Sequence, residues 1–308
     1  MADSAQALSL VVPIDITAAK LTDSNIPEPD STVGEVVYVA GTTYTIGQRV
    51  ILVSTHTLYE SLQNSNVGHS PDVSPTWWVP VSKTNRFRMF DQINNSVSTH
   101  ATVIDTTITA GEIVNSLALL NLVAQTIRVR MTDPIDGLVF DTTFQMQSPP
   151  SAADWWSYYF EPIYNKTDLY TTLPSYGAAA IRVEVNQSGV PASVGVMLLG
   201  RSNLIGDGVQ YGASLGIQDY SRKERNEFGD LILVERSFSK KASFRMFVPN
   251  SQRAAVNRLL TQYRAKPCLW IGIAGEEDTY IYGIYKEFAF IIEFVDNSVL
   301  TLDLEGLT

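Results

Sequence analysis

The sequence predicts an all-β protein with several domains, and three observations lead to this fold class. Many short runs of β-branched and aromatic residues alternate with polar residues and end at glycine, proline, asparagine or aspartate, a pattern typical of half-buried strands. Only one segment has the apolar spacing of an amphipathic helix. Strands joined by short turns favour sandwiches or barrels, because a parallel sheet needs crossovers of about a dozen residues or more.

Length and composition allow a sizeable core. With 45% apolar and 18% charged residues, the chain of 308 residues is neither disordered nor fibrous, and it is long enough for two or three domains. Changes in polar, proline and aromatic content suggest where these domains meet. We expect an N-terminal arm and linker at residues 1–33, a compact module at 34–84, a β-sandwich at 85–200 and a C-terminal β domain with one helix at 201–308.

The first 33 residues have no feature of a targeting segment. The apolar run at residues 8–12 lacks a basic flank and a small-residue cleavage site, so we do not expect a signal peptide. Residues 24–31 are polar and carry two prolines, as linkers and extended arms do. No stretch of about 20 apolar residues runs uninterrupted in the chain, and no membrane span is expected.

The module at residues 34–84 combines aromatic side chains with glycines and prolines, and it is expected to begin with a strand at residues 34–39. Four of its aromatic residues are candidates for carbohydrate binding, because aromatic rings stack on sugar rings while nearby polar groups bind hydroxyls. Alternatively these side chains form the core, since so small a module has few other residues to build one. The four candidates are Tyr44, Tyr59, Trp77 and Trp78.

The chain has two pairs of adjacent tryptophans, and each pair is expected to place one indole at the surface. If residues 76–79 are extended, Trp77 and Trp78 point to opposite faces, and one of them is available for a ligand or another subunit. The same argument applies to Trp155 and Trp156 in the sandwich region. There, an exposed aromatic residue marks either a protein interface or a sugar site.

The later regions contain the clearest patterns of secondary structure. Alternation of apolar and polar residues predicts half-buried strands at residues 126–131, 180–185 and 231–236. One helix is expected at about residues 251–265, and Pro267 prevents its continuation. The apolar face of this helix consists of Ala255, Val256, Leu259, Leu260 and Tyr263, and its capping candidates are Asn250 and Ser251.

Residues 219–230 form an unusual charged segment that leads into the strand expected at residues 231–236. Arginines here can pair with carboxylates of a neighbouring domain or subunit, which fixes register and partner choice. The alternative, a charged active-site loop, has neither a nucleophile nor a base beside it. The candidates for subunit contacts are Arg222, Lys223, Arg225 and Glu227.

Several function classes find no support in the sequence. A net charge of −10 argues against binding of nucleic acid, which relies on a basic surface. We expect no cofactor and no metal, because the three histidines are isolated and no phosphate-binding loop is present. An enzyme is not expected, because neither a nucleophile elbow nor a placed pair of catalytic acids occurs. Cys268 is the single cysteine, so we expect a buried thiol and folding in a reducing cytoplasm.

Motifs in most of the chain resemble a family of minor structural proteins encoded among the tail genes of tailed bacteriophages. The resemblance rests on residues 215–229 (LGIQDYSRKERNEFG), 267–270 (PCLW), 281–288 (IYGIYKEF) and 304–307 (LEGL), with the VER sequence that ends at Arg236. It implies a structural subunit of the virion tail.

Two further segments resemble carbohydrate-binding modules. Residues 44–91, with Trp78 and the NRFRMFD sequence at 85–91, are similar to the chitin-binding-like module that these tail proteins tend to carry. The middle region, with Trp156, Tyr159, Phe160 and the run at residues 194–200, looks like a galactose-binding-type jelly roll. Both resemblances imply sugar recognition without identifying a sugar.

The resemblance therefore leaves two functions open. In the first, the chain is made in the host cytoplasm and becomes an assembly subunit of a phage tail or baseplate. It then binds copies of itself and neighbouring tail proteins, and fibre anchoring is an additional role. In the second, the chain is a virion adhesin that binds host surface polysaccharide through the small module or the jelly roll.

Overall fold

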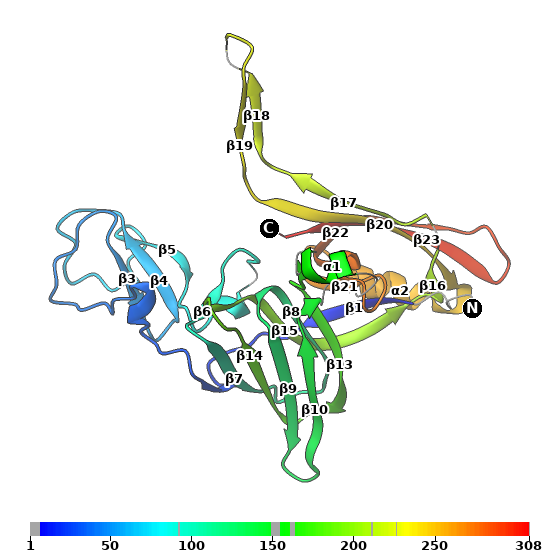
Figure 1. Ribbon diagram of the computed structural model, residues 1–308, viewed down its shortest axis with the longest axis horizontal. Coiled ribbons are helices and arrows are strands. Elements are labelled where there is room, and N and C mark those ends of the chain that lie inside the picture. Colours follow the sequence, from blue (N-terminus) through cyan, green and yellow to red (C-terminus); the bar gives the residue numbers. More distant parts are fainter. Residues whose placement is uncertain are drawn as a thin grey trace.

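The computed structural model describes residues 7–91, 93–148, 155–160, 164–210, 212–225 and 227–307. It confirms the all-β class, with 53% of residues in strands and several antiparallel sheets. Figure 1 shows a small module to one side, a sandwich in the lower centre, a long sheet above it, and a hairpin that projects away from the body.

The small module contains a three-stranded antiparallel sheet. The segment at residues 34–39 is not a strand, contrary to the sequence prediction, and only Val37 forms an isolated bridge with Ile51. Val36 and Val39 are 59% and 56% exposed, because this segment is not part of a sheet and neither of these two side chains packs against a core. The elements of this module are the 3₁₀ turn Ser31–Val33, β3 (Arg49–Leu52), β4 (Thr57–Ser61) and β5 (Trp78–Lys83).

The sandwich packs a five-stranded sheet against part of a larger sheet, and side chains of both layers form one core. The strands predicted at residues 126–131 and 180–185 are confirmed, and alternate residues such as Ile127, Val129 and Val183 are buried. The five strands are β10 (Gly137–Gln145), β9 (Thr126–Asp133), β14 (Ala180–Asn186), β7 (Val103–Thr109) and β2 (Leu21–Ser24). The facing layer contains β13 (Leu169–Tyr176), β8 (Val114–Val123), β15 (Ala192–Ile205) and β6 (Ser98–His100).

The larger sheet continues from the sandwich into the C-terminal region without a break, so the predicted division at residues 200 and 201 lies inside β15. β15 pairs with β8 along its first part and with β1 along its second part. From β15 onward, the neighbouring strands of the larger sheet are, in order, β1 (Leu8–Pro13), β21 (Cys268–Ile271), β22 (Tyr280–Ile291), β23 (Asn297–Gly306), β20 (Phe238–Pro249) and β16 (Gly208–Val209). β17 (Ser214–Asp219) also pairs with β20.

Residues 8–13 belong to a sheet and not to a free arm, in contrast to the organisation predicted for residues 1–33. β1 lies between β15 and β21 and forms antiparallel pairs with both. Leu8, Leu10 and Val11 are fully buried, because an interior strand covered on both faces requires a nearly continuous apolar run. The N-terminal segment thus joins the sandwich to the C-terminal sheet.

The predicted helix is confirmed as α2 (Asn250–Gln262), with Val256 and Leu260 buried against the C-terminal core. Its start differs from the prediction, because Pro249 is the N-cap and no side chain caps the helix. The Asn250 side chain instead donates to the Val295 carbonyl at 2.7 Å and accepts from Ser298. Shorter elements are the turns Arg88–Phe90 and Glu277–Thr279, strands β11 (Gln147–Ser148), β12 (Tyr164–Asn165), β18 (Arg222–Arg225) and β19 (Leu231–Val234), and helix α1 (Trp155–Phe160).

The Cys268 thiol is buried, as the sequence predicted, with 1% of the residue exposed. Burial raises its pKa to about 11, and the nearby Lys266 only partly opposes this shift. We expect a thiol reagent at pH 8 to label the folded protein at least about a hundredfold more slowly than the unfolded protein, since the thiolate is both scarce and inaccessible. Timed labelling with and without denaturant measures this ratio, and equal rates would contradict the buried position.

Candidate functional site

Three of the four aromatic candidates in the small module form its core. Trp78, Tyr44 and Tyr59 are 1%, 6% and 8% exposed, and Tyr44 packs edge-on against Trp78 with ring centroids 5.2 Å apart. The indole N–H of Trp78 donates to the His69 carbonyl at 2.9 Å. These three rings therefore have no open face for a sugar, and the alternative of a core role fits them.

Trp77 is the less buried member of its pair, although residues 76 and 77 lie in a turn and not in the extended conformation that the prediction assumed. Its ring packs partly against the core of the module. Trp77 is partly buried, and its ring stacks on His69 with centroids 4.0 Å apart and an interplanar angle of 11°. His69 in turn lies 3.1 Å from the Asn66 amide oxygen. One face of Trp77 is thus covered by an imidazole, and the remaining surface is the only part of the four candidates that a ligand can reach.

The NRFRMFD sequence contains a buried polar joint between the small module and the sandwich. Asn85 is fully buried, and its side chain donates to Asp30 and to the Thr99 carbonyl. Its backbone N–H donates to Glu35 at 2.6 Å. Burial alone would raise the pKa of Asp30, but hydrogen bonds from Thr32 and Asn85 outweigh burial and lower it. The bonds of Asn85 join segments that are distant in sequence, so a structural role explains this part of the motif.

Both Trp155 and Trp156 are exposed, at 78% and 68%. The expectation that only one of them faces outward assumed an extended chain, whereas the segment forms helix α1. Residues four apart are neighbours on a helix, so Trp155 stacks on Tyr159 and Trp156 lies beside Phe160. Each tryptophan thus contacts an aromatic residue of its own helix.

The charged segment forms one strand of a projecting hairpin, which we call the arm (residues 221–225 and 227–236). Arg222 pairs with Glu224 and Lys223 pairs with Asp219, so these candidate contacts are made within the segment itself. Arg225 donates to the Gly229 carbonyl at 3.1 Å. The fourth candidate, Glu227, is exposed in the turn.

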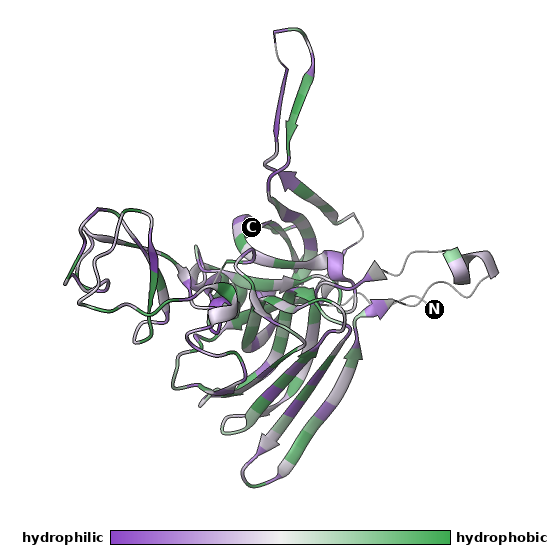
Figure 2. Ribbon diagram, turned by 60° about the vertical axis from the view of Figure 1, so that its left-hand side comes forward, coloured by the Kyte–Doolittle hydropathy of each residue, from purple (hydrophilic) through white to green (hydrophobic). Residues whose placement is uncertain are grey.

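The apolar strand of the arm is exposed, although the sequence predicted a half-buried strand. Leu231, Ile232, Leu233 and Val234 are 55%, 48%, 64% and 44% exposed. Figure 2 shows this hydrophobic strand beside its polar partner, away from the body of the molecule. β18 and β19 pair only with each other within the described part of the chain. The exposed side chains of β19 alternate between both faces of the hairpin, so neither face is covered by another layer.

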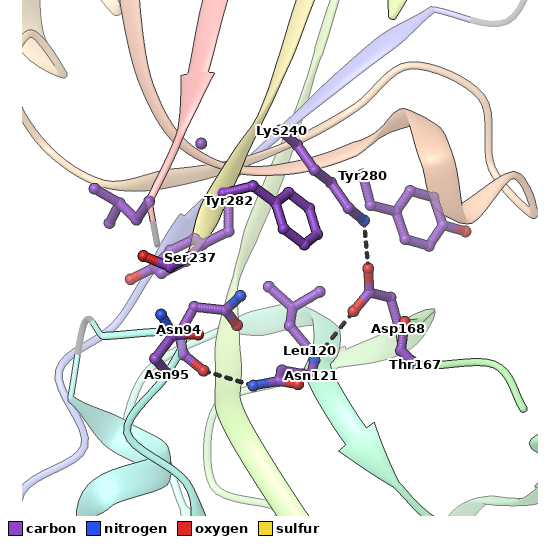
Figure 3. A pocket seen from close by; sticks show the side chains of 13 residues that line it. Asn94, Asn95, Leu120, Asn121, Thr167, Asp168, Ser237, Lys240, Tyr280 and Tyr282 are labelled. Atoms are coloured by element: carbon purple, nitrogen blue, oxygen red, sulfur yellow. Dashed lines mark hydrogen bonds and ion pairs between the residues drawn. The ribbon is translucent and has the colours of Figure 1, made fainter. Parts of the chain in front are cut away.

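A cavity of about 280 Å³ lies where the sandwich meets the C-terminal sheet, and sequence reasoning did not detect it. Figure 3 shows its central ion pair, in which the Lys240 ammonium group lies 2.6 Å from the Asp168 carboxylate. The other oxygen of Asp168 accepts the backbone N–H of Asn121 at 3.1 Å. The Asn121 side chain donates to the Asn94 carbonyl at 2.8 Å. These contacts hold segments of β8, β20 and two loops around one hollow.

Two tyrosines extend the floor of this cavity. Tyr280 and Tyr282 are 4% and 6% exposed, and burial raises the pKa of both phenols, so each stays protonated at neutral pH. Tyr280 accepts the Gly275 N–H at 2.8 Å and packs edge-on against Tyr170. The Tyr282 hydroxyl has no hydrogen-bond partner among the described residues.

Comparison with models of known protein families found no match, and neither did comparison with curated protein sequences. Over the ranges that the structure describes, no group of three or more histidine, cysteine, aspartate or glutamate residues could hold a metal ion. No helix in those same ranges is long and apolar enough to cross a membrane. Any proposal about function therefore rests on the geometry and on the resemblance described above.

Proposed function

We propose that the protein is a structural subunit of a bacteriophage tail or baseplate that assembles with copies of itself and with neighbouring tail proteins. The observation that carries this proposal is the arm. Its apolar strand, Leu231–Val234, projects from the body with every side chain exposed.

The arm needs a partner for physical reasons. A continuous run of four large apolar residues is typical of a strand that is buried on both faces. A two-stranded hairpin is at best marginally stable by itself in water, and large exposed apolar surfaces mark protein contacts. A projecting arm that contacts a different surface of the next subunit makes a heterologous contact, and such contacts generate rings or filaments. An arm of this kind suits a subunit of a repeating assembly.

The assignment to a phage particle is supported by the resemblance to tail-gene products, whose longest matching segment, residues 215–229, lies at and before this arm. The chain would be made in the host cytoplasm and carried in the virion tail. Anchoring of fibres is compatible with this position and would use other exposed surfaces, such as the aromatic residues of α1.

The assembly proposal is tested by making the arm polar. The double variant Leu231→Asp/Leu233→Asp changes two residues of one strand face, and Ile135→Asp, at a residue that is 92% exposed in another hairpin, is the matched control. We expect the wild type and the control to sediment as oligomers and to be found in purified phage tails, and the double variant to remain monomeric and absent from particles. The distribution of sedimentation coefficients and peptide mass spectrometry of purified virions measure these outcomes.

Two results would contradict the proposal. If antibody against the folded protein labels no part of purified particles and mass spectrometry finds no peptide of the chain there, the protein is not a virion component. If the double variant assembles like the control, the arm is not the contact. The first result rejects the phage assignment, and the second rejects only the role of the arm.

A second candidate function is adhesion to host surface polysaccharide. The observation that favours it is the partly exposed Trp77, which lies on a polar module together with the stacked His69. If the small module is the adhesion site, Trp77→Ala abolishes binding to a glycan array while particle incorporation is unchanged. Unchanged glycan binding by this variant would remove the small module as the site.

A further inference from the structure

The junction cavity has a lining that combines polar side chains with an exposed aromatic ring. Phe238 is 54% exposed at its edge, and Asn95, Thr167 and Ser237 are exposed polar residues of the same lining. These groups come from three separate segments of the chain, because Ser237 and Phe238 are adjacent. The cavity is therefore a product of the packing between the sandwich and the C-terminal sheet.

A second hollow continues from this cavity. It shares Ser237, Gly306 and Leu307 with the first and extends toward Tyr220 and Glu305. Both hollows are open to the surface rather than enclosed. A ligand with more than one unit can therefore occupy both hollows at once.

The charges of both hollows are already paired. Asp168, which is 8% exposed, is paired with Lys240, and Glu305 is paired with Lys286 at 2.9 Å. The hydrogen bond from Lys286 lowers the pKa of Glu305, so this carboxylate stays charged and neutralised near pH 7. A charged ligand would have to compete with these pairs, whereas a neutral ligand leaves them intact.

The walls of the cavity are fixed by close backbone packing. A Cβ atom on Gly195 would lie 2.7 Å from both the Asn94 carbonyl oxygen and Asn121 Cβ, so only glycine allows this loop to approach β15. Asn121 has φ of 53°, a left-handed conformation that asparagine tolerates better than most residues. The hollow is thus formed before any ligand binds, which lowers the entropic cost of binding.

From this geometry we propose that the junction cavity binds a neutral saccharide, with Phe238 as the stacking ring and with Asn95, Thr167 and Ser237 as partners for hydroxyl groups. Aromatic rings present a flat apolar platform to sugar rings, and amide and hydroxyl side chains both donate and accept hydrogen bonds. No residue of the arm lines either hollow, although Tyr220 and Ser237 flank the arm and line the second hollow. Loss of assembly in the arm variant therefore does not by itself decide whether the cavity binds a saccharide. The cavity is also distinct from the Trp77 surface of the small module.

The test is binding of neutral oligosaccharides to the full-length protein. The probes are cellotriose, maltotriose, galactobiose and chitotriose, with trigalacturonic acid as the charged comparison, and titration calorimetry measures the dissociation constants. We expect at least one neutral probe to bind and the acidic probe to bind more weakly. Phe238→Ala should weaken the binding of that probe about tenfold, the equivalent of losing one stacked ring.

The matched controls separate this site from the other candidates. Phe294→Ala removes a ring that is 52% exposed far from the cavity lining, and it should leave binding unchanged. Trp77→Ala should also leave binding unchanged. The inference is overturned if no neutral probe binds, if Phe238→Ala binds as the wild type does, or if Trp77→Ala alone abolishes binding. Protection of Cys268 from thiol reagents verifies that the C-terminal core is folded in the Phe238 and Phe294 variants. Hydrogen exchange of the β3, β4 and β5 amides verifies that the small module is folded in Trp77→Ala.

Discussion

Replacing Trp78 with alanine is expected to unfold the small module. Trp78 is 1% exposed and contacts both Tyr38 and Tyr44, with ring centroids 5.9 and 5.2 Å away. Removal of a large buried aromatic side chain typically costs about 3–5 kcal/mol, the sum of lost burial and the cavity that remains. The core cluster of this module has only four buried residues, so the free energy of unfolding of the module is small and a loss of this size is enough to unfold it.

The measurement must report on the module alone, because a chain of several domains does not unfold in one transition. Hydrogen exchange of the β3, β4 and β5 amides serves this purpose, and we expect their protection to be lost in Trp78→Ala. Trp77→Ala is the matched control, since the neighbouring indole is only partly buried, and protection should be largely retained. Native-like protection in Trp78→Ala would show that the ring is not essential to this core.

This pair also determines how the adhesion hypothesis can be tested. A double replacement of Trp77 and Trp78 would lose glycan binding whether or not Trp77 contacts a glycan, because the module itself would unfold. The single variant Trp77→Ala changes the partly buried ring and leaves the fully buried one. Adhesion through the small module is therefore tested by the glycan binding of Trp77→Ala alone.

The sequence predicted those elements in which the spacing of apolar residues matches the side that the structure buries. β9 and β14 have one buried and one exposed face, so their alternation was sufficient to locate them. The apolar positions of α2 identified most of its buried face: Val256 and Leu260 are buried, and Leu259 and Tyr263 pack against the same core. Ala255 is exposed, contrary to the prediction. The same alternation at residues 34–39 failed, because a periodic pattern does not show whether a neighbouring strand is available.

Other features depend on contacts that no local pattern contains. β1 was assigned to an arm, although its apolar run is what an interior strand requires. The run Leu231–Val234 has the same character, but its side chains are exposed, and only the structure shows this exposure. The junction cavity was not predictable either, since Asp168 and Lys240 are 72 residues apart in sequence.

Gly200→Ala is expected to be among the most destabilising single substitutions in the chain. Gly200 lies in β15 where its neighbouring strands change from sandwich to C-terminal sheet, opposite Pro13 on one side and Ser116 on the other. A Cβ atom there would lie 2.2 Å from the Val12 carbonyl oxygen, which is backbone and cannot rotate away. β1 and β15 would have to separate, so we expect a loss of about 3 kcal/mol, at the upper end for overpacking.

Gly177→Ala is the matched control for this substitution. A Cβ atom at Gly177 would meet Ile113 at 3.5 Å, an ordinary contact, and its φ is not in the left-handed region. Restricting the unfolded chain at such a site stabilises by about 0.4–1 kcal/mol, so this variant should match or slightly exceed the wild type. Guanidinium titrations with hydrogen exchange of β1 and β15 distinguish the two variants. Equal stability of both would mean that β1 is not fixed against β15, and the N-terminal segment would then not join the sandwich to the C-terminal sheet.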